Sequence, residues 1–149
     1  MTIKVTTDTS VLISGLVPPR RRIKDRLFFQ QHDLYMRSNE ILEKIASKEY
    51  ANHVPLITMI EVAAVVSRLT NDAKSVELAL SFVNDNSRLY PDVYLLDRAM
   101  EIGKATKASG FDVLFMACSE VSGSRLLTDD RKMYEKAVEY GLNAGFLRS

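Results

Sequence analysis

The chain is poor in the residues that build disulfide frameworks and zinc sites. Among 149 residues it has one cysteine, Cys118, and two histidines, His32 and His53. A single cysteine excludes an internal disulfide network and a thiolate zinc cage. Two histidines disfavour a histidine-rich metal centre and leave few candidate bases for a Ser-His-Asp hydrolase. Any chemistry is therefore expected to come from other side chains.

Scarce glycine and proline and a balanced charge exclude further classes of protein. Six glycines and four prolines leave little room for disordered or collagen-like segments. Twenty basic and nineteen acidic side chains give a net charge of +1, which excludes a strong general attraction to nucleic acid. A local basic patch is the remaining route to such binding, and a solvated surface loop is an equally good interpretation of it. The dense basic run contains Arg20, Arg21, Arg22, Lys24 and Arg26.

Long hydrophobic runs are also missing. The apolar stretch Val11–Val17 is short, and the stretch Val54–Val66 is interrupted by Glu61, so neither spans a bilayer. No basic segment precedes an apolar one in the manner of a secretory signal. We therefore expect a soluble, cytoplasmic protein with no membrane partner. Length, 46% hydrophobic residues and 26% charged residues suit a single globular domain over 1–149.

The hydrophobic pattern alternates between strand and helix periods along the chain. The predicted strands are Ile3–Thr7, Val54–Ile57, Leu89–Leu96, Arg125–Leu127 and Leu142–Leu147. The predicted helices are Val11–Leu16, Leu34–Tyr50, Thr58–Leu69, a segment capped by Asn71–Asp72, Asp97–Lys107, Asp112–Val121 and Arg131–Tyr140. Alternation of this kind requires crossover connections, so we predict an α/β protein. Its expected architecture is a three-layer α/β/α sandwich around a central, mostly parallel sheet.

Four carboxylates stand at related places in this pattern. Asp8 directly follows the first predicted strand, Glu61 lies one helical turn after the second, and Asp130 follows Arg125–Leu127. Asp112 opens the most apolar helix. In open parallel sheets, functional groups gather outside the carboxyl ends of the strands. Four carboxylates gathered there would repel one another unless a hard divalent cation, Mg²⁺ or Mn²⁺, neutralised them. The matching chemistry is phosphodiester hydrolysis by metal-activated water.

Helix capping is the competing explanation for each acid. Thr58-x-x-Glu61 and Ser109-x-x-Asp112 both match a capping box. Asp130 is placed to be an N-cap, and Asp8 a turn residue that precedes a Ser10 cap. Capping does not exclude metal binding, because one oxygen of each carboxylate stays free.

Four segments resemble the motifs of PIN-domain ribonucleases, most closely the VapC-type toxins of toxin–antitoxin pairs. They occur in the family's order and cover nearly the whole chain. Individually they are weak signals, and their combination is specific. The segments are Asp8-Thr9-Ser10-Val11-Leu12-Ile13, Pro55-Leu56-Ile57-Thr58 with Glu61-Val62, Phe111-Asp112 with its apolar helix, and Leu127-Thr128-Asp129-Asp130.

The resemblance implies a Mg²⁺- or Mn²⁺-dependent endoribonuclease that acts on RNA, often as a homodimer, with a small antitoxin protein as its inhibitor. The implied metal ligands and catalytic residues are Asp8, Glu61, Asp112 and Asp130. Asp129 is the alternative fourth acid, because the Asp129-Asp130 doublet blurs the match to the T-x-D motif. The hydroxyls of Ser10 and Thr128 are expected to orient Asp8, a metal-bound water or a substrate phosphate; a cap or turn role is equally compatible.

Other functions remain alternatives on the same sequence. One is a PIN-like nuclease for RNA processing that is not a toxin, and another is an inactive RNA- or protein-binding module. A phospho-accepting receiver domain needs an acidic pair after the first strand, and Asp8-Thr9 does not provide it. A haloacid-dehalogenase phosphatase needs D-x-D at that place, where this chain has Ser10.

Overall fold

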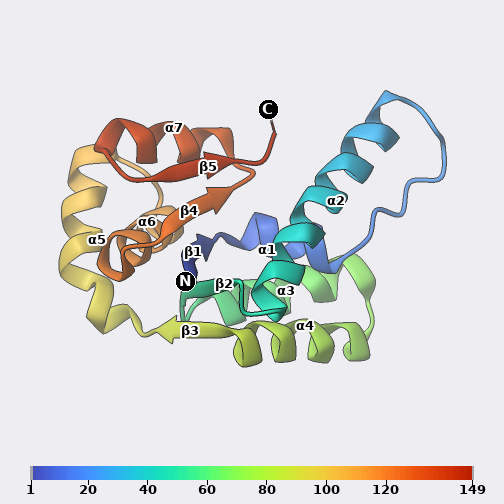
Figure 1. The fold of residues 1–149 in the computed structure, drawn as a ribbon, viewed down its shortest axis with the longest axis horizontal. Helices are drawn as coiled ribbons and strands as arrows, with labels where there is room; N and C mark the ends of the chain where they lie inside the picture. The colour runs from blue at the N-terminus through green and yellow to red at the C-terminus, as the bar shows by residue number, and fades with distance from the viewer. Residues whose placement is uncertain (1, 149) are drawn as a thin grey trace.

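The centre of the fold is a five-stranded sheet, seen in a computed structural model that describes residues 2–148 (Figure 1). Its strands lie in the order β3-β2-β1-β4-β5, and each neighbouring pair is parallel. The mostly parallel sheet predicted above is therefore confirmed, while residues 1 and 149 of the predicted domain lie outside the described residues. The strands are β1 (Ile3–Thr7), β2 (Tyr50–Pro55), β3 (Ser87–Tyr90), β4 (Arg125–Thr128) and β5 (Ala144–Phe146).

Helices cover both faces of this sheet, as the predicted three-layer sandwich requires. One core cluster joins β1 and β2 to α1 (Thr9–Leu16), α2 (Arg26–Ala46), α3 (Thr58–Thr70) and α4 (Ala73–Asn86). The other joins β4 to α5 (Asp92–Thr106), α6 (Gly110–Ser122) and α7 (Arg131–Tyr140). No helix within residues 2–148 has the length and apolar character needed to cross a membrane.

The order in which successive strands join the sheet reverses at β1. From β1 the chain passes through β2 to β3 on one side, with α1 to α4 on one face of the sheet. It then returns through α5 and α6 to β4 and β5 on the other side (Figure 1). Val5 of β1 accordingly pairs with Asn52 of β2 on one side and with Arg125 of β4 on the other. Open α/β sheets bind their ligands at such a reversal, outside the carboxyl ends of the strands.

Two predicted boundaries near α2 were wrong. The predicted helix Leu34–Tyr50 begins eight residues earlier in the structure, because the Asp25 carboxylate accepts a hydrogen bond from the Phe28 amide at 3.0 Å and caps it. The helix ends at Ala46, and Tyr50 begins β2, which was predicted at Val54–Ile57. The strand β2 overlaps that prediction at Val54 and Pro55 only.

The third strand was also misplaced. The predicted strand Leu89–Leu96 is β3 (Ser87–Tyr90) followed by the first turn of α5. Pro91 lacks the backbone N–H that another ladder hydrogen bond would need, and the chain turns into the helix there. Val93 and Tyr94, whose side chains favour strands, lie on the solvent side of α5 with 74% and 72% exposure. Residue preference was therefore overridden by the packing of Leu95 and Ala99 into the core.

The apolar helix predicted at Asp112–Val121 is confirmed as the central buried element, α6. Its residues Phe115 to Ser119 are all nearly inaccessible to solvent. Cys118 lies among them, and burial raises the pKa of its thiol to about 12. Cys118 therefore packs as a small apolar side chain and is not a nucleophile.

We predict that Gly15→Ala destabilises the protein, because Gly15 of α1 lies directly against α2. A Cβ atom at Gly15 would lie 2.6 Å from Leu42 Cδ1 and 3.1 Å from the backbone carbon of Ser38. Overpacking of this kind outweighs the helix-propensity gain and should lower the free energy of unfolding by about 1–2 kcal/mol. Urea denaturation measures the change.

Gly103→Ala is the matched control on α5. Its added Cβ would meet only Val113 Cγ1, at an ordinary 3.8 Å. The control should therefore stabilise the protein by about 0.5–1 kcal/mol. Equal effects of the two substitutions would contradict the steric account of Gly15.

Candidate functional site

Asp8 lies between the end of β1 and the start of α1, at the point where the strand order reverses. Its carboxylate is the N-cap of α1, where Oδ1 accepts a hydrogen bond from the Val11 amide at 3.2 Å. The prediction that Ser10 caps this helix was wrong, since helix α1 begins at Thr9. Only 4% of Asp8 is exposed, so a charged group here has lost nearly all of its hydration.

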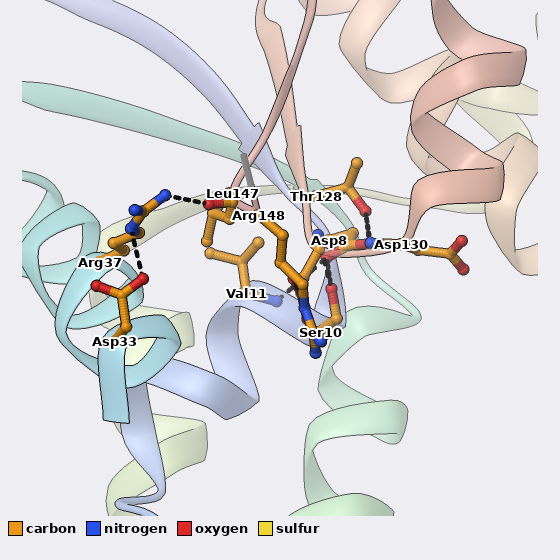
Figure 2. Close-up of polar contacts among 10 residues, drawn as sticks. Asp8, Ser10, Val11, Asp33, Arg37, Thr128, Asp130, Leu147 and Arg148 are labelled. Atoms are coloured by element: carbon orange, nitrogen blue, oxygen red, sulfur yellow. Dashed lines mark hydrogen bonds and ion pairs between the residues drawn. The ribbon is translucent and has the colours of Figure 1, made fainter. Parts of the chain in front are cut away.

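Two hydroxyls hold the Asp8 carboxylate from opposite sides. Ser10 Oγ donates to Oδ1 at 2.5 Å, and Thr128 Oγ1 donates to Oδ2 at 2.5 Å (Figure 2). Each hydroxyl also accepts from the loop after β4: Ser10 Oγ from the Asp129 amide at 3.3 Å and Thr128 Oγ1 from the Asp130 amide at 2.9 Å. The two hydroxyls therefore tie the end of β1 to the end of β4 through Asp8.

Burial dominates the protonation of Asp8. It raises the pKa of this carboxyl from 3.8 to about 6, even though the hydrogen bonds from Ser10, Thr128 and Val11 lower it. The nearby charge of Asp130 raises the pKa further. A cation placed beside Asp8 would therefore stabilise its ionised carboxylate.

Asp130 and Asp112 extend the negative charge beyond Asp8. Asp130 is the N-cap of α7, as predicted, with Oδ1 accepting from the Met133 amide at 3.2 Å. Its exposed carboxylate points away from Asp8 (Figure 2). Burial raises the pKa of Asp112, and the charge of Asp130 raises it further. Asp130 thus lies within electrostatic reach of the other two acids.

The N-terminus of α6 is capped as predicted on one side only. The Ser109 hydroxyl accepts from the Asp112 amide at 3.3 Å, which confirms that half of the predicted capping box.

Glu61 is held at the same edge by a different contact from the one predicted. Its Oε1 accepts a hydrogen bond from the Thr9 hydroxyl at 2.6 Å, and Thr9 is the neighbour of Asp8 in the chain. The predicted Thr58-x-x-Glu61 capping box was wrong. Ile57 occupies the N-cap of α3, and the buried Thr58 hydroxyl has no hydrogen-bond partner within residues 2–148. Glu61 therefore faces α1 rather than its own helix end.

Asp129, the alternative to Asp130, has another partner. Arg148 Nε donates to Asp129 Oδ1 at 2.6 Å, and an Arg148 terminal nitrogen donates to Oδ2 at 2.9 Å. The Asp129 side chain is 9% exposed. Both of its oxygens are thus engaged by one guanidinium, in the fork geometry that arginine offers a carboxylate.

Sequence reasoning missed three residues that shape this edge. Thr9 holds Glu61, and Arg148 holds Asp129. Asn52 is buried in β2, where its Oδ1 accepts from both the amide and the hydroxyl of Thr7 at 3.2 and 3.0 Å. The position of Thr9 inside the first motif was a usable signal. Nothing local in the sequence marks Asn52 or Arg148, whose partners are distant along the chain.

The donor set at this edge fits a hard divalent cation. Asp8, Asp112 and Asp130 offer oxygen ligands. Burial raises the pKa of Asp8 and Asp112, and the charge of Asp130 raises both further. Within residues 2–148, no three His, Cys, Asp or Glu side chains are grouped closely enough to bind one metal ion directly. Mg²⁺ usually retains several waters and takes only one or two protein carboxylates, so direct contact with all three is not required.

Comparison with known proteins gives a family and a fold. Residues 5–139 match the family model of the PIN domain. No curated protein is significantly similar to the chain in sequence.

Three solved structures resemble this one. PAE2754 from Pyrobaculum aerophilum has 17% identity and a TM-score of 0.59, over 90% of this chain and 79% of that one. FitAcB from Neisseria gonorrhoeae has 14% identity and a TM-score of 0.59, over 96% and 97%. A domain of a functionally unknown protein from Methanocaldococcus jannaschii has 17% identity and a TM-score of 0.57, over 99% and 93%. At these identities, the likeness is one of fold.

We predict that Asp8→Asn removes a pH-dependent loss of stability. Because the folded protein binds the Asp8 proton more tightly than the unfolded chain, the stabilisation is complete below about pH 4. It is lost as the pH rises through about 6. The free energy of unfolding of Asp8→Asn relative to the parent should thus rise by about 2 kcal/mol between pH 4 and pH 7.

Urea denaturation across this pH range, with a chelator present, provides the measurement. The parent protein serves as the reference at every pH, so titrations elsewhere in the chain cancel in the difference. Parallel stability curves for the two proteins would contradict a raised pKa at Asp8.

Proposed function

The chain belongs to the PIN domain family, and we propose that it is a metal-dependent endoribonuclease that hydrolyses RNA phosphodiester bonds. PIN domains are generally metal-dependent nucleases. The observation that carries the proposal is the buried Asp8, held by two hydroxyls and lying near the exposed charge of Asp130. Burial of a carboxylate beside a second negative charge makes its ionised form unfavourable, and a bound metal cation would stabilise that form.

Asp8, Asp112 and Asp130 would hold Mg²⁺ or Mn²⁺, with Glu61 contributing directly or through water. When bound, the cation supplies Lewis-acid charge and an activated water for attack on phosphorus. Proton and metal compete for Asp8, so metal affinity should weaken as the pH falls through about 6.

Asp130 is our choice for the fourth acid of the site. One of its oxygens caps α7, and the carboxylate is exposed and near enough to Asp112 for its charge to raise the pKa of that carboxyl. Asp129 is engaged at both oxygens by Arg148. Recruiting Asp129 to a metal would first require breaking that ion pair.

The chain's own residues position the reacting groups. Ser10 and Thr128 fix the orientation of Asp8 and use their oxygens to hold the loop that carries Asp130. Thr9 fixes Glu61 at the same edge. Their hydrogen bonds place the acids before a cation arrives, which lowers the reorganisation that binding requires.

We further propose that the protein is the cytoplasmic toxin of a toxin–antitoxin pair, acting as a homodimer and restrained by a small antitoxin. The resemblance of its four motifs to VapC-type toxins supports this role. An RNA-processing nuclease that is not a toxin is the second candidate, because the same site would serve both. An inactive binding module is the third candidate, although the unbalanced carboxylates disfavour it.

We predict that the purified protein cleaves single-stranded RNA in Mg²⁺ or Mn²⁺ and that a chelator stops the reaction. Asp8→Asn, Asp130→Asn and Glu61→Gln should each lower the cleavage rate about 100-fold or more, because each removes a charge that holds the cation. Gel analysis of end-labelled RNA measures the rates. Glu61→Gln keeps an oxygen that can accept from Thr9, so its loss of activity would report charge rather than structure.

Asp97→Asn on the exposed surface of α5 is the matched control for these substitutions and should leave cleavage unchanged. Asp129→Asn should retain more activity than Asp130→Asn. The reverse order would assign the fourth acid to Asp129. Full activity of a folded Asp8→Asn protein would refute the metal site.

A growth assay separates the toxin from the processing enzyme. Induced expression of the parent chain should arrest bacterial growth, and Asp8→Asn at equal protein level should not, because growth arrest requires RNA cleavage. Normal growth with an active parent nuclease would favour RNA processing. Equal arrest by both proteins would exclude cleavage as the cause.

A further inference from the structure

The C-terminal strand and α2 meet beside the carboxylates. Arg37, midway along α2, donates to the backbone oxygen of Leu147 at 2.8 Å and pairs with Asp33 at 3.0 Å (Figure 2). Arg148, which follows Leu147 in the chain, makes the ion pair with Asp129. The two guanidinium groups therefore flank the chain end on the side of the sheet where Asp8 and the loop after β4 lie.

A hollow of about 200 Å³ separates these two elements. Most of its lining residues are polar or charged, unlike those of the more apolar hollow between α1 and α2. The Arg148 side chain is 60% exposed and that of Arg37 is 45% exposed, so both are accessible to a ligand. The lining residues are Gln30, Asp33, Leu34, Arg37, Leu147 and Arg148.

The same face of α2 continues outward from this hollow. Arg26 precedes Gln30 by four residues, and Arg37 follows Asp33 by four, so these side chains form one stripe along the helix. Phe29 lies at the solvent edge of the stripe and is 60% exposed. From Arg26 to Arg37 the helix rises about 17 Å. That length matches about five stacked nucleotides.

Positive charge is concentrated at the outer end of this stripe. Residues 20–26 contain five basic side chains and one acidic side chain, Asp25, in a chain whose net charge is +1. Asp25 pairs with Arg21. Arg20, Arg22, Lys24 and Arg26 form no ion pair with any residue of the described part of the chain. The basic patch predicted from the sequence is thus available to an anionic ligand.

We propose that single-stranded RNA leaves the carboxylate edge along this face of α2. We define the α2 track as Arg148, Arg37, Gln30, Phe29 and Arg26. The inference deepens the proposed function and rests on it, because it adds a path for the substrate on one side of the same site.

The chemistry of the track suits a flexible, unpaired strand. Arginines at the inner and outer ends bind phosphates, and Arg148 retains N–H donors that Asp129 does not use. An exposed aromatic ring offers a stacking surface to an unpaired base of any sequence. Bases inside a duplex are already stacked on their neighbours, so Phe29 adds nothing to duplex binding. Charge complementarity favours an anionic strand over a basic or apolar protein segment, and the exposed ring of Phe29 favours RNA bases over the side chains of an acidic segment.

The test measures binding of a fluorescent single-stranded RNA of about 12 nucleotides to the full chain in a chelator, so that no metal is required. Fluorescence anisotropy should show that Phe29→Ala weakens the affinity about tenfold for the single strand and leaves that for the duplex unchanged. Arg26→Gln should lower the slope of log affinity against log salt by about 0.7, the loss of one phosphate contact.

Tyr94→Ala and Arg88→Gln are the matched controls. Tyr94 is an exposed aromatic residue on α5, and Arg88 is an exposed basic residue on the far edge strand β3. Neither substitution should change the affinity for single-stranded RNA. Circular dichroism verifies that all four variants keep the fold of the parent.

The outcomes distinguish the track from the proposed function. If the parent cleaves RNA but Phe29→Ala and Arg26→Gln bind like the controls, the track is wrong and the nuclease stands. If the parent binds RNA through these residues but does not cleave it, the track stands and the nuclease fails. If the parent neither binds nor cleaves RNA, both proposals are wrong. If Phe29→Ala and Arg26→Gln change the affinity for a protein partner but not that for RNA, the α2 track binds protein instead.

Discussion

The burial of one carboxylate, Asp8, is the constraint on which the rest of the site depends. A carboxylate at the end of a central strand loses its hydration, and three hydrogen bonds from Ser10, Val11 and Thr128 compensate only part of that loss. The same hydroxyls accept from the loop that carries Asp129 and Asp130. Anything that moves Asp8 therefore moves the β4 loop, and the two segments act as one unit.

The order of the strands explains why this unit forms. Because β1 lies between β2 and β4, its carboxyl end adjoins the ends of strands that come from both halves of the chain. Residues 120 positions apart, Asp8 and Thr128, become hydrogen-bond partners. The helices that follow β1 and β4 cover opposite faces of the sheet, which leaves the acids at their N-termini gathered at one edge.

Charge is segregated in this molecule although its sum is nearly zero. The carboxylates gather at the sheet edge, while the basic side chains of residues 20–26 stand at the far end of α2. Arg37 and Arg148 lie between the two regions, each engaged with an acidic partner. Local fields of opposite sign, rather than the net charge, govern how an anionic chain and a divalent cation are held near each other.

Periodicity in the sequence was sufficient for the architecture and for the placement of the acids at strand ends. β1, α3, α6, β4 and α7 were predicted closely, because each carries a clear apolar period between polar boundaries. The errors arose where residue preference and packing disagree. Val93 and Tyr94 favour a strand but lie on the exposed side of α5, and the Thr58–Glu61 spacing matches a cap that the helix does not form.

The sequence by itself determined the α/β alternation, the four acids and their order along the chain, because these depend on spacing over a few residues. Only the tertiary structure decided which groups meet. The contact of Glu61 with Thr9, the pairing of Asp129 with Arg148 and the buried Asn52 beneath Thr7 join residues that lie 19 to 52 positions apart. Such contacts depend on strand order and register, which arise from burying apolar surface across the whole chain rather than from any local pattern.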